Sequence, residues 1–446
     1  MQQPEKTSLY VVLAAASAAS AGLLFGYDVA VINGALVFLR ADFHLGSVAT
    51  EMLTAILFIG CAVGAAISGW ASDRYGRRAV LFCAGLLFCG AAALAASASQ
   101  IAQLMAARSL AGMALGATLL IGPLYIAEIS PAHKRGMLVT LNQLLLVAGT
   151  LVGFVVNYEL AQHVHGNWRL MFSLGAIPAV VLCISMLRIP ESPRWLLQQG
   201  KRQQALAVLQ RISPGANVEA TVDEIANAIR EESGTYRELL GTALRRPMVL
   251  AVMLAIIQQL TGFNTVLYYG AIIFAEHTGA SAAQAIGMNV FVGVVNMIFT
   301  ILGLLFIDKL GRRLLLLTAL AGMGFFMLVF AAMLAYMPGQ STLLLLPVLG
   351  VVASFAFGLG TGVWVCLSEL FPNRIRGRAM SIANIVLWFS VTILTATFLS
   401  LIKMFGISGV FVLYASLCGA SFAYIAVYLP ETKNRTLEEI ESSWSK

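Results

Sequence analysis

The sequence predicts an all-α membrane protein with twelve transmembrane helices in two similar six-helix bundles. Of its 446 residues, 59% are hydrophobic and only 11% are charged, whereas soluble proteins carry about 25% charged residues. Apolar runs long enough to cross a bilayer, which takes roughly 20 residues, recur along the whole chain. Charged motifs that follow these runs appear twice, once in each half. This composition excludes a soluble multi-domain protein.

The apolar runs set the expected helices and the divisions between them. They cover residues 9–34, 50–71, 79–97, 102–125, 137–158, 169–188, 248–274, 285–306, 314–336, 342–367, 379–402 and 408–428. We expect an N-terminal bundle at 1–189 and a C-terminal bundle at 248–429. Between them, 190–247 is polar and charged, and its helical periodicity at 200–212 and 218–232 predicts short amphipathic helices on the cytoplasmic face. A cytoplasmic tail is expected at 430–446.

Positive charge marks one side of the expected membrane. The net charge is +7, and lysine and arginine crowd the tails and the loops after the even-numbered runs. Only Arg40, Arg169 and Lys403 fall on the other side. Because cytoplasmic loops carry excess lysine and arginine, we expect both termini in the cytoplasm and no nucleic-acid partner. The six cysteines all fall within apolar runs, so we expect buried apolar side chains rather than metal ligands or disulfides.

The seventh run contains a polar cluster made of Gln258, Gln259, Thr261 and Asn264. Hydrocarbon does not tolerate such groups unless they are hydrogen-bonded. On a regular helix, at about 100° per residue, Gln259 and Asn264 point away from each other, so we expect a bend near Gly262. An uncharged amide cluster suits a neutral solute rich in hydroxyl groups. Discontinuous helices of this kind line the substrate sites of many transporters.

The repeated motifs carry a resemblance to a known family. DRYGRR at 73–78 returns as DKLGRR at 308–313, and PESPRW at 190–195 returns as PETK at 430–433. Together with QQLTGFN at 258–264, these motifs resemble the sugar porter family of the major facilitator superfamily, almost from end to end. The resemblance implies alternating-access transport of a hexose or pentose by a monomer in the cytoplasmic (inner) membrane. We expect no cofactor, no metal and no enzymatic activity.

Charged residues at the expected cytoplasmic helix ends are assigned to a gate. In sugar porters such residues form ion pairs between the bundles, and exposed pairs are worth only about 0–1 kcal/mol each, so the gate opens readily. A simple positive-inside anchor is the alternative. The residues placed in this network are Asp73, Arg77, Glu128, Arg135, Glu191, Arg194, Asp308, Arg312, Glu369, Arg376 and Glu431.

Two charges lie inside the expected membrane, Asp28 in the first run and Arg108 in the fourth. Each is about six residues from the outer end of its run, roughly 9 Å deep at 1.5 Å per residue, so we expect them to pair. Resemblance to proton-coupled sugar porters implies that Asp28 takes up a proton and releases Arg108, which predicts sugar–proton symport. A static structural ion pair is the alternative.

The resemblance also implies the sugar-binding residues, because amides bind sugar hydroxyls and an aromatic ring covers the apolar C–H face. These are Phe25, Gln143, Gln258, Gln259, Asn264, Asn296, Gly360 and Trp364. Tyr268 and Tyr269 match an outer gate, although composition alone would equally fit an interfacial belt. Asn289 is expected to link helices. Many bacterial members carry Gln or Asn where this chain has Leu387, so the resemblance does not fix which sugar or polyol is bound.

Three other functions are alternatives to sugar–proton symport. A facilitative uniporter would share the fold and the site, but facilitative members carry an uncharged residue at the position of Asp28. A non-transporting sugar sensor usually has a long cytoplasmic tail, whereas sixteen residues follow Pro430. A membrane glycosyltransferase would need paired carboxylates or a metal site facing water. The sequence has no such cluster and no nucleotide-binding Gly-rich Lys motif.

Overall fold

The computed structural model describes residues 9–131, 134–163, 167–212, 217–231, 239, 241–277, 280–336, 341–371 and 373–433. Within these ranges every regular element is helical, as predicted. Among the described residues, eleven helical segments, some of them made of two or three consecutive helices, are long and apolar enough to cross a membrane. The last of them, α18 (Asn373–Tyr428), is interrupted at Gly406, where φ is +70°. Its two arms match the expected runs at 379–402 and 408–428, which gives the twelve predicted crossings.

The chain forms two compact units that interleave along the sequence. Unit 1 comprises residues 1–28, 56–153 and 168–232, and unit 2 comprises 29–55, 154–167 and 233–446. Three helices are therefore shared between the units, namely α1 (Leu9–Asp42), α2 (Ser47–Tyr75) and α5 (Arg135–His163). The predicted bundles at 1–189 and 248–429 follow the sequence repeat and stay a prediction.

Unit 1 is built on closely packed helices. Its other long elements are α3 (Arg77–Ala96), α4 (Ile101–Ile129), α6 (Trp168–Leu174) and α7 (Ala176–Arg188). α3 packs against α4, α6 and α7. Gly60 and Gly64 of α2 face Ser109 and Met113 of α4 so closely that an added Cβ would overlap backbone atoms. Small residues at this spacing let membrane helices approach backbone to backbone.

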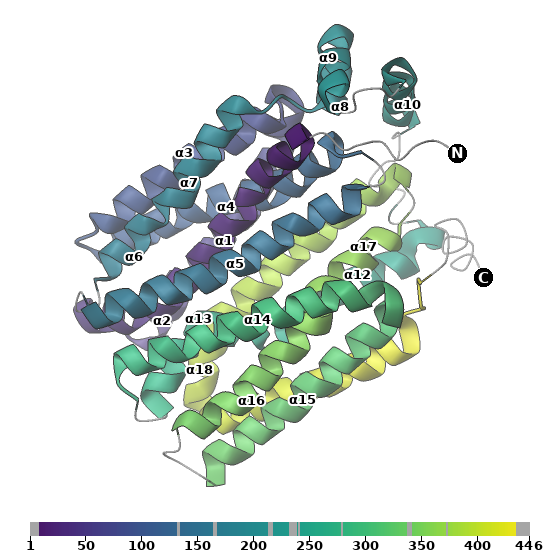
Figure 1. The fold of residues 1–446 in the computed structure, drawn as a ribbon. Coiled ribbons are helices and arrows are strands. Elements are labelled where there is room, and N and C mark those ends of the chain that lie inside the picture. Colours follow the sequence, from purple (N-terminus) through teal and green to yellow (C-terminus); the bar gives the residue numbers. More distant parts are fainter. Residues whose placement is uncertain are drawn as a thin grey trace. The chain divides into compact units, whose positions relative to one another are not determined.

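Three short helices of unit 1 follow the sixth crossing, and the second and third of them match the segments predicted at 200–212 and 218–232. They are α8 (Pro193–Gln198), α9 (Arg202–Ile212) and α10 (Val218–Glu231), and they pack on one another (Figure 1). Their small core contains Trp195, Leu196 and Ala205. The indole Nε1 of Trp195 also donates to the carbonyl of Asp73 at 2.9 Å, which ties α8 to the end of α2.

Unit 2 contains the helices of the second half of the chain. They are α12 (Thr242–Leu260), α13 (Phe263–His277), α14 (Ala282–Leu310), α15 (Arg312–Tyr336), α16 (Ser341–Ser354), the π-helix η2 (Phe355–Leu359), α17 (Gly360–Glu369) and α18. α15 packs on α16 and α18, and α12 also packs on α18. The seventh crossing is broken between α12 and α13, and the tenth contains a π-helical turn, a feature frequent at functional sites.

The surface of these helices suits a lipid environment. Large apolar side chains such as Trp70, Phe325 and Leu346 are more than 60% exposed, and contiguous apolar exposure marks membrane or partner contact. The chain is therefore a multi-pass membrane protein. Four cysteines are buried as predicted and Cys89 is half-buried, but Cys83 is exposed on α3. The prediction was wrong for Cys83 because an apolar run does not reveal which side of its helix faces lipid.

Gly262 is the residue that makes the break in the seventh crossing. Its φ is +83°, and an added Cβ would lie 2.5 Å from the ring of Tyr414. A left-handed backbone costs an L-residue roughly 1–2 kcal/mol, and the contact with Tyr414 adds to this cost. We therefore expect Gly262→Ala to lower the thermal unfolding midpoint of the detergent-purified protein. Gly419→Ala is the control, since nothing lies within 4 Å of that position; equal effects of the two substitutions would contradict this account.

Candidate functional site

The break at Gly262 brings together amides that a regular helix would separate. α12 ends at Leu260 and α13 starts at Phe263, which confirms the predicted bend. Asn264 now donates a hydrogen bond from Nδ2 to Oε1 of Gln259. Gln258 donates from Nε2 to the carbonyl of Leu359 in η2 at 3.2 Å. The amide cluster of the seventh crossing therefore faces the π-helical turn of the tenth.

Aromatic packing fixes this arrangement. The rings of Phe263, at the start of α13, and Phe355, at the start of η2, are stacked with centroids 3.7 Å apart and planes 7° from parallel. Gly360 and Trp364 follow in α17, both half-buried, and Asn296 is buried on α14. The structure thus places all six of the predicted sugar-binding residues of the second half in unit 2.

Several polar atoms around the break are buried without a hydrogen-bond partner in the described part of the chain. They are Oε1 of Gln258, Oγ1 of Thr261, Oγ1 of Thr361 and the hydroxyl of Tyr414. A buried polar atom that lacks a partner costs about 1–3 kcal/mol, so clusters of them need a reason. A hydroxylated solute offers both donors and acceptors to such atoms. Thr361 and Tyr414 had not been singled out in the sequence, because a single hydroxyl in an apolar run gives no distinctive signal.

The remaining predicted sugar contacts lie in unit 1. Phe25 of α1 and Gln143 of α5 are both half-buried. Next to Gln143, the buried Asn142 lies against Gly22 of α1, and its Oδ1 has no hydrogen-bond partner in the described part of the chain. Asn142 was missed in the sequence, although it is adjacent to Gln143 in the same apolar run.

The two tyrosines of α13 are buried rather than placed at a lipid interface. Tyr268 is 4% exposed and Tyr269 is fully buried. The Tyr269 hydroxyl donates to the carbonyl of Thr395 in α18 at 2.6 Å, and its ring stacks on Phe398. These contacts argue against an interfacial belt, whose residues sit at the headgroup level.

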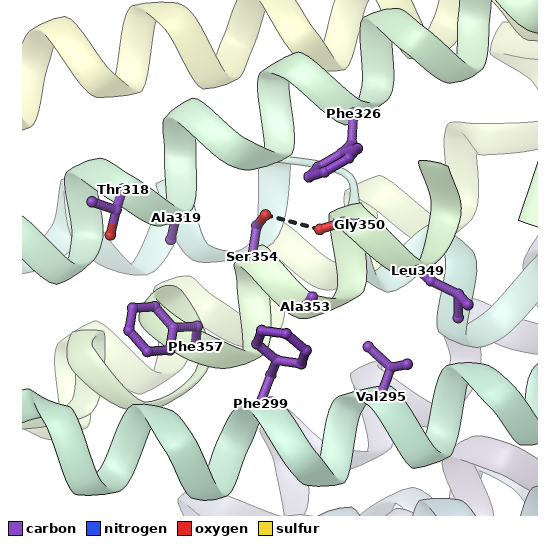
Figure 2. Close-up of a pocket in the computed structure, with 10 residues that line it drawn as sticks. All are labelled: Val295, Phe299, Thr318, Ala319, Phe326, Leu349, Gly350, Ala353, Ser354 and Phe357. Atoms are coloured by element: carbon purple, nitrogen blue, oxygen red, sulfur yellow. Dashed lines mark hydrogen bonds between the residues drawn. The ribbon is translucent and has the colours of Figure 1, made fainter. Parts of the chain in front are cut away.

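A cavity of about 440 Å³ lies elsewhere in unit 2, among α14, α15, α16 and η2 (Figure 2). Its lining is apolar and includes Phe299, Phe326 and Phe357. The hydroxyl of Ser354 is already bonded to the carbonyl of Gly350 at 2.8 Å, as the dashed line in Figure 2 shows. The lining's other hydroxyl, that of Thr318, donates to the carbonyl of Leu315 at 3.0 Å. Both hydroxyls are thus already bonded within their own helices, and none of the predicted site residues belongs to this lining.

Asp28 and Arg108 form the expected pair inside unit 1. Nη1 of Arg108 lies 2.7 Å from Oδ2 of Asp28, and the two residues are only 1% and 3% exposed. Nε and Nη2 of Arg108 have no hydrogen-bond partner in the described residues, and its guanidinium lies 5.8 Å from the ring of Phe172. A single hydrogen bond between described atoms therefore joins these two charges. Separating them inside the protein is costly, because each buried charge would lose its partner in a medium of low dielectric constant.

The charged motifs at the ends of α2 and α4 form a compact module in unit 1. Glu128 binds Arg77 through both carboxylate oxygens, at 3.0 and 3.1 Å, and accepts a hydrogen bond from Ser192 at 2.5 Å. Asp73 lies 3.3 Å from Arg77. Glu191 accepts hydrogen bonds from the first backbone N–H groups of α3. Burial raises the pKa of the Glu191 carboxyl, and these N–H groups partly offset the rise.

The same module recurs in unit 2. Arg312 binds Glu369, with an N–O distance of 2.9 Å, and Asp308 at 2.9 Å, and Thr432 donates to Glu369 at 2.6 Å. Glu431 accepts from the first backbone N–H groups of α15. Ser192 and Thr432 were not predicted as members of these modules. Their hydrogen bonds form only because the segments that contain them fold back to Glu128 at the end of α4 and to Glu369 at the end of α17.

The remaining three predicted gate residues are Arg135, Arg194 and Arg376. Arg135 is exposed at the start of α5, and Arg376 donates to the carbonyl of Phe371 at 3.3 Å. Arg194 lies in the first turn of α8. The contacts of these gate residues are internal to each unit, so ion pairing between gate residues of the two halves stays a prediction.

Histidine and cysteine do not gather at any described site. Within the described ranges, no three His, Cys, Asp or Glu side chains lie close enough together to hold a metal ion. His163 lies 3.5 Å from Glu159 at the end of α5, and His165 falls outside the described residues.

Comparisons with known proteins agree with this architecture. The family described as "Sugar (and other) transporter" matches residues 14–444. The chain is 34% identical to the arabinose-proton symporter of Bacillus subtilis, over 98% of this chain and 96% of that protein. It is also 34% identical to the D-xylose-proton symporter of Escherichia coli, over 95% and 93% of the two chains. The inward-open structure of the xylose transporter XylE from E. coli superposes with a TM-score of 0.85 and 32% identity, covering 98% of this chain and 100% of that one.

The two charge modules differ in burial, which gives a stability prediction. The side chains of Arg77 and Glu128 are 4% and 5% exposed, whereas those of Arg312 and Glu369 are 14% and 23% exposed. Removing one partner of a buried pair costs about 3–5 kcal/mol, and solvent reduces this cost where it reaches the pair. Glu128→Gln should therefore lower the thermal unfolding midpoint in detergent more than Glu369→Gln. The opposite order would contradict the prediction.

Proposed function

Because the chain belongs to the family of sugar transporters, which are not enzymes, we propose that it imports a monosaccharide together with protons by alternating access. The buried Asp28–Arg108 pair is the observation that carries the proton part. Within the described residues the pair is joined by one hydrogen bond, and Arg108 and Asp28 are only 1% and 3% exposed. A proton on Asp28 removes its charge, so the attraction to Arg108 falls and the two side chains can separate. The arabinose and xylose relatives are themselves named as proton symporters.

The proposed sugar site of unit 2 lies at the break between α12 and α13. Three amides lie at this break, those of Gln258, Gln259 and Asn264. The other proposed sugar contacts from unit 2 are Asn296, Gly360 and Trp364. The unpartnered polar atoms at the break support this assignment, since sugar hydroxyls would satisfy them. Phe25 and Gln143 remain proposed sugar contacts from unit 1 on the family resemblance. Tyr268 and Tyr269 are proposed to close over the bound sugar.

The orientation follows from charge. We place the arginine-rich helix ends, with both termini, in the cytoplasm, so the opposite helix ends face outward. The two modules around Arg77 and Arg312 would then brace the cytoplasmic ends of each unit while the transporter changes conformation. Ion pairs in these modules that solvent reaches contribute little free energy.

The direct test is uptake into proteoliposomes under an imposed proton gradient. Competition by glucose, galactose, xylose, arabinose and inositol would identify the substrate. Uptake that follows the sugar gradient but ignores the proton gradient would identify a uniporter instead. Binding without any uptake would identify a sensor.

Asp28→Asn should abolish accumulation driven by the proton gradient while leaving sugar exchange between the two sides. Asparagine keeps the size of the side chain but cannot take up a proton, so uphill transport loses its coupling. Asp42→Asn, at the exposed end of the same helix, is the matched control and should accumulate sugar as the parent does. Undiminished accumulation by Asp28→Asn would rule out this residue as the coupling site.

Gln258→Ala should raise the KM for sugar by roughly 3- to 10-fold, the effect of losing one neutral hydrogen bond. The KM of uptake in proteoliposomes measures this change. Gln103→Ala is the control, because Gln103 bonds to Leu94 and Ser97 at a loop of unit 1. An unchanged KM for Gln258→Ala would remove this residue from the site.

A further inference from the structure

Two buried polar side chains in unit 2 have no role in the site described above. Asn33, in the second half of α1, is 1% exposed, and Glu51, in the first turns of α2, is 2% exposed. Each makes its hydrogen bonds to helices of the second half of the chain. Both ends of every contact lie within unit 2. Neither residue was singled out in the sequence.

Asn33 binds both ends of one helical hydrogen bond in α13. Its Oδ1 accepts from the backbone N–H of Ala271 at 3.1 Å, and its Nδ2 donates to the carbonyl of Leu267 at 2.8 Å. In a regular α-helix the N–H of residue 271 donates to the carbonyl of residue 267. Gly270 permits this approach, since an added Cβ would lie 2.4 Å from Oδ1 of Asn289, to which Asn33 also donates at 3.3 Å, and 3.2 Å from Nδ2 of Asn33. Tyr268 and Tyr269 lie in the same turn.

Glu51 also binds a backbone N–H of another helix, on a different pair of helices. Its Oε1 accepts from the backbone N–H of Ser400 in α18, and its Oε2 accepts from the Ser400 hydroxyl, both at 2.7 Å. In a regular helix that N–H would donate to the carbonyl of Ala396. No lysine or arginine in the described residues forms an ion pair with Glu51. The carboxylate is therefore held by the backbone of α18 and a hydroxyl.

Contacts of this kind can be released at low cost. When Asn33 or Glu51 leaves, the backbone N–H that it held can bond to the carbonyl one turn earlier in its own helix. Of the partners described here, Oδ1 of Asn289 is the side-chain atom that loses its bond to Asn33. The nearby ion pair between Arg40 and Glu276 is 27% and 46% exposed, and pairs this exposed contribute about 0–1 kcal/mol. The buried amide and carboxylate are therefore the stronger links between these helices.

We propose that Asn33 and Glu51 are reversible clamps that keep the outward side of the transporter closed. Asn33 holds α1 to α13 beside the two tyrosines, and Glu51 holds α2 to α18. Both are positioning residues, which act through the helices and do not touch the sugar. The inference rests on the proposed transport function, because alternating access supplies the open state in which the clamps are released.

The test uses a buried reporter on the full-length protein in lipid nanodiscs, without sugar or proton gradient. Thr54, one turn from Glu51 on α2, is fully buried, so Thr54→Cys reports opening through its reaction rate with a charged maleimide. The protein without the reporter corrects for labelling of native cysteines. Adding Asn33→Ala or Glu51→Ala should raise the rate about tenfold, the effect of losing one or two hydrogen bonds.

A conservative variant and a matched control separate clamping from general loosening. Glu51→Gln should stay within about twofold of the parent, because its amide can accept from the Ser400 N–H and donate to the Ser400 oxygen. Asn157→Ala removes another fully buried amide, whose bond to the carbonyl of Ala30 joins α5 to α1. It should leave the rate within about twofold, since the clamps remain.

The outcomes are distinct. Unchanged labelling in both alanine variants would overturn the proposal, and so would an equal rise in Asn157→Ala. The two clamps join different helix pairs, so either alanine variant alone suffices if the other does not fold. Because labelling needs neither sugar nor a gradient, a failure of the proposed transport would appear only in the uptake assays.

Discussion

The rest of this structure depends on the lack of hydrogen-bonding partners in hydrocarbon. Inside a membrane every buried polar group must find its partner in the protein. Each departure from a regular helix therefore requires nearby groups that hydrogen-bond the polar atoms it leaves. At the break after Leu260, Asn264 donates a hydrogen bond to Gln259, and Gln258 donates one to a carbonyl of η2. At the end of α4, Glu128 uses both oxygens on Arg77 and one also on Ser192. Where a buried polar atom has no partner in the described residues, as is the case for Oε1 of Gln258, a hydroxylated ligand is the natural complement.

The two charge modules of the internal repeat have the same contacts but differ in solvent exposure. In both halves a carboxylate, Glu191 or Glu431, caps the start of a helix by accepting its first backbone N–H groups. Negative charge is stabilised at that position by the helix dipole. The arginine at the start of each helix then binds the carboxylate at the end of another. Yet the pair in unit 1 is nearly sealed and the pair in unit 2 is reached by solvent, so the same contacts contribute unequally to stability.

Local signals in the sequence predicted the features that local chemistry determines. The twelve crossings follow from run length, the linker helices α9 and α10 from periodicity, and the break at Gly262 from the angle between Gln259 and Asn264. The shared depth of Asp28 and Arg108 was compatible with their pairing, but the sequence did not show that the first and fourth crossings are neighbours. The π-helix η2, the partners of Asn33 and the lipid-facing position of Cys83 depend on long-range packing, which no single run reveals. The interleaving of the two compact units along α1, α2 and α5 has the same cause.

Two kinds of contact hold the ends of these helices, and they suit different tasks. At the arginine-rich ends, each carboxylate has a cation or several backbone N–H groups, and breaking such a set leaves charges with no replacement partner. At the opposite ends in unit 2, Asn33 and Glu51 occupy positions that the helix can fill again by itself. The first arrangement favours permanence and the second favours repeated opening. A transporter needs both kinds of contact. Its helices can move as a rigid body only if the contacts that hold the outward side closed cost less free energy to break than the contacts that hold the helices of a unit together.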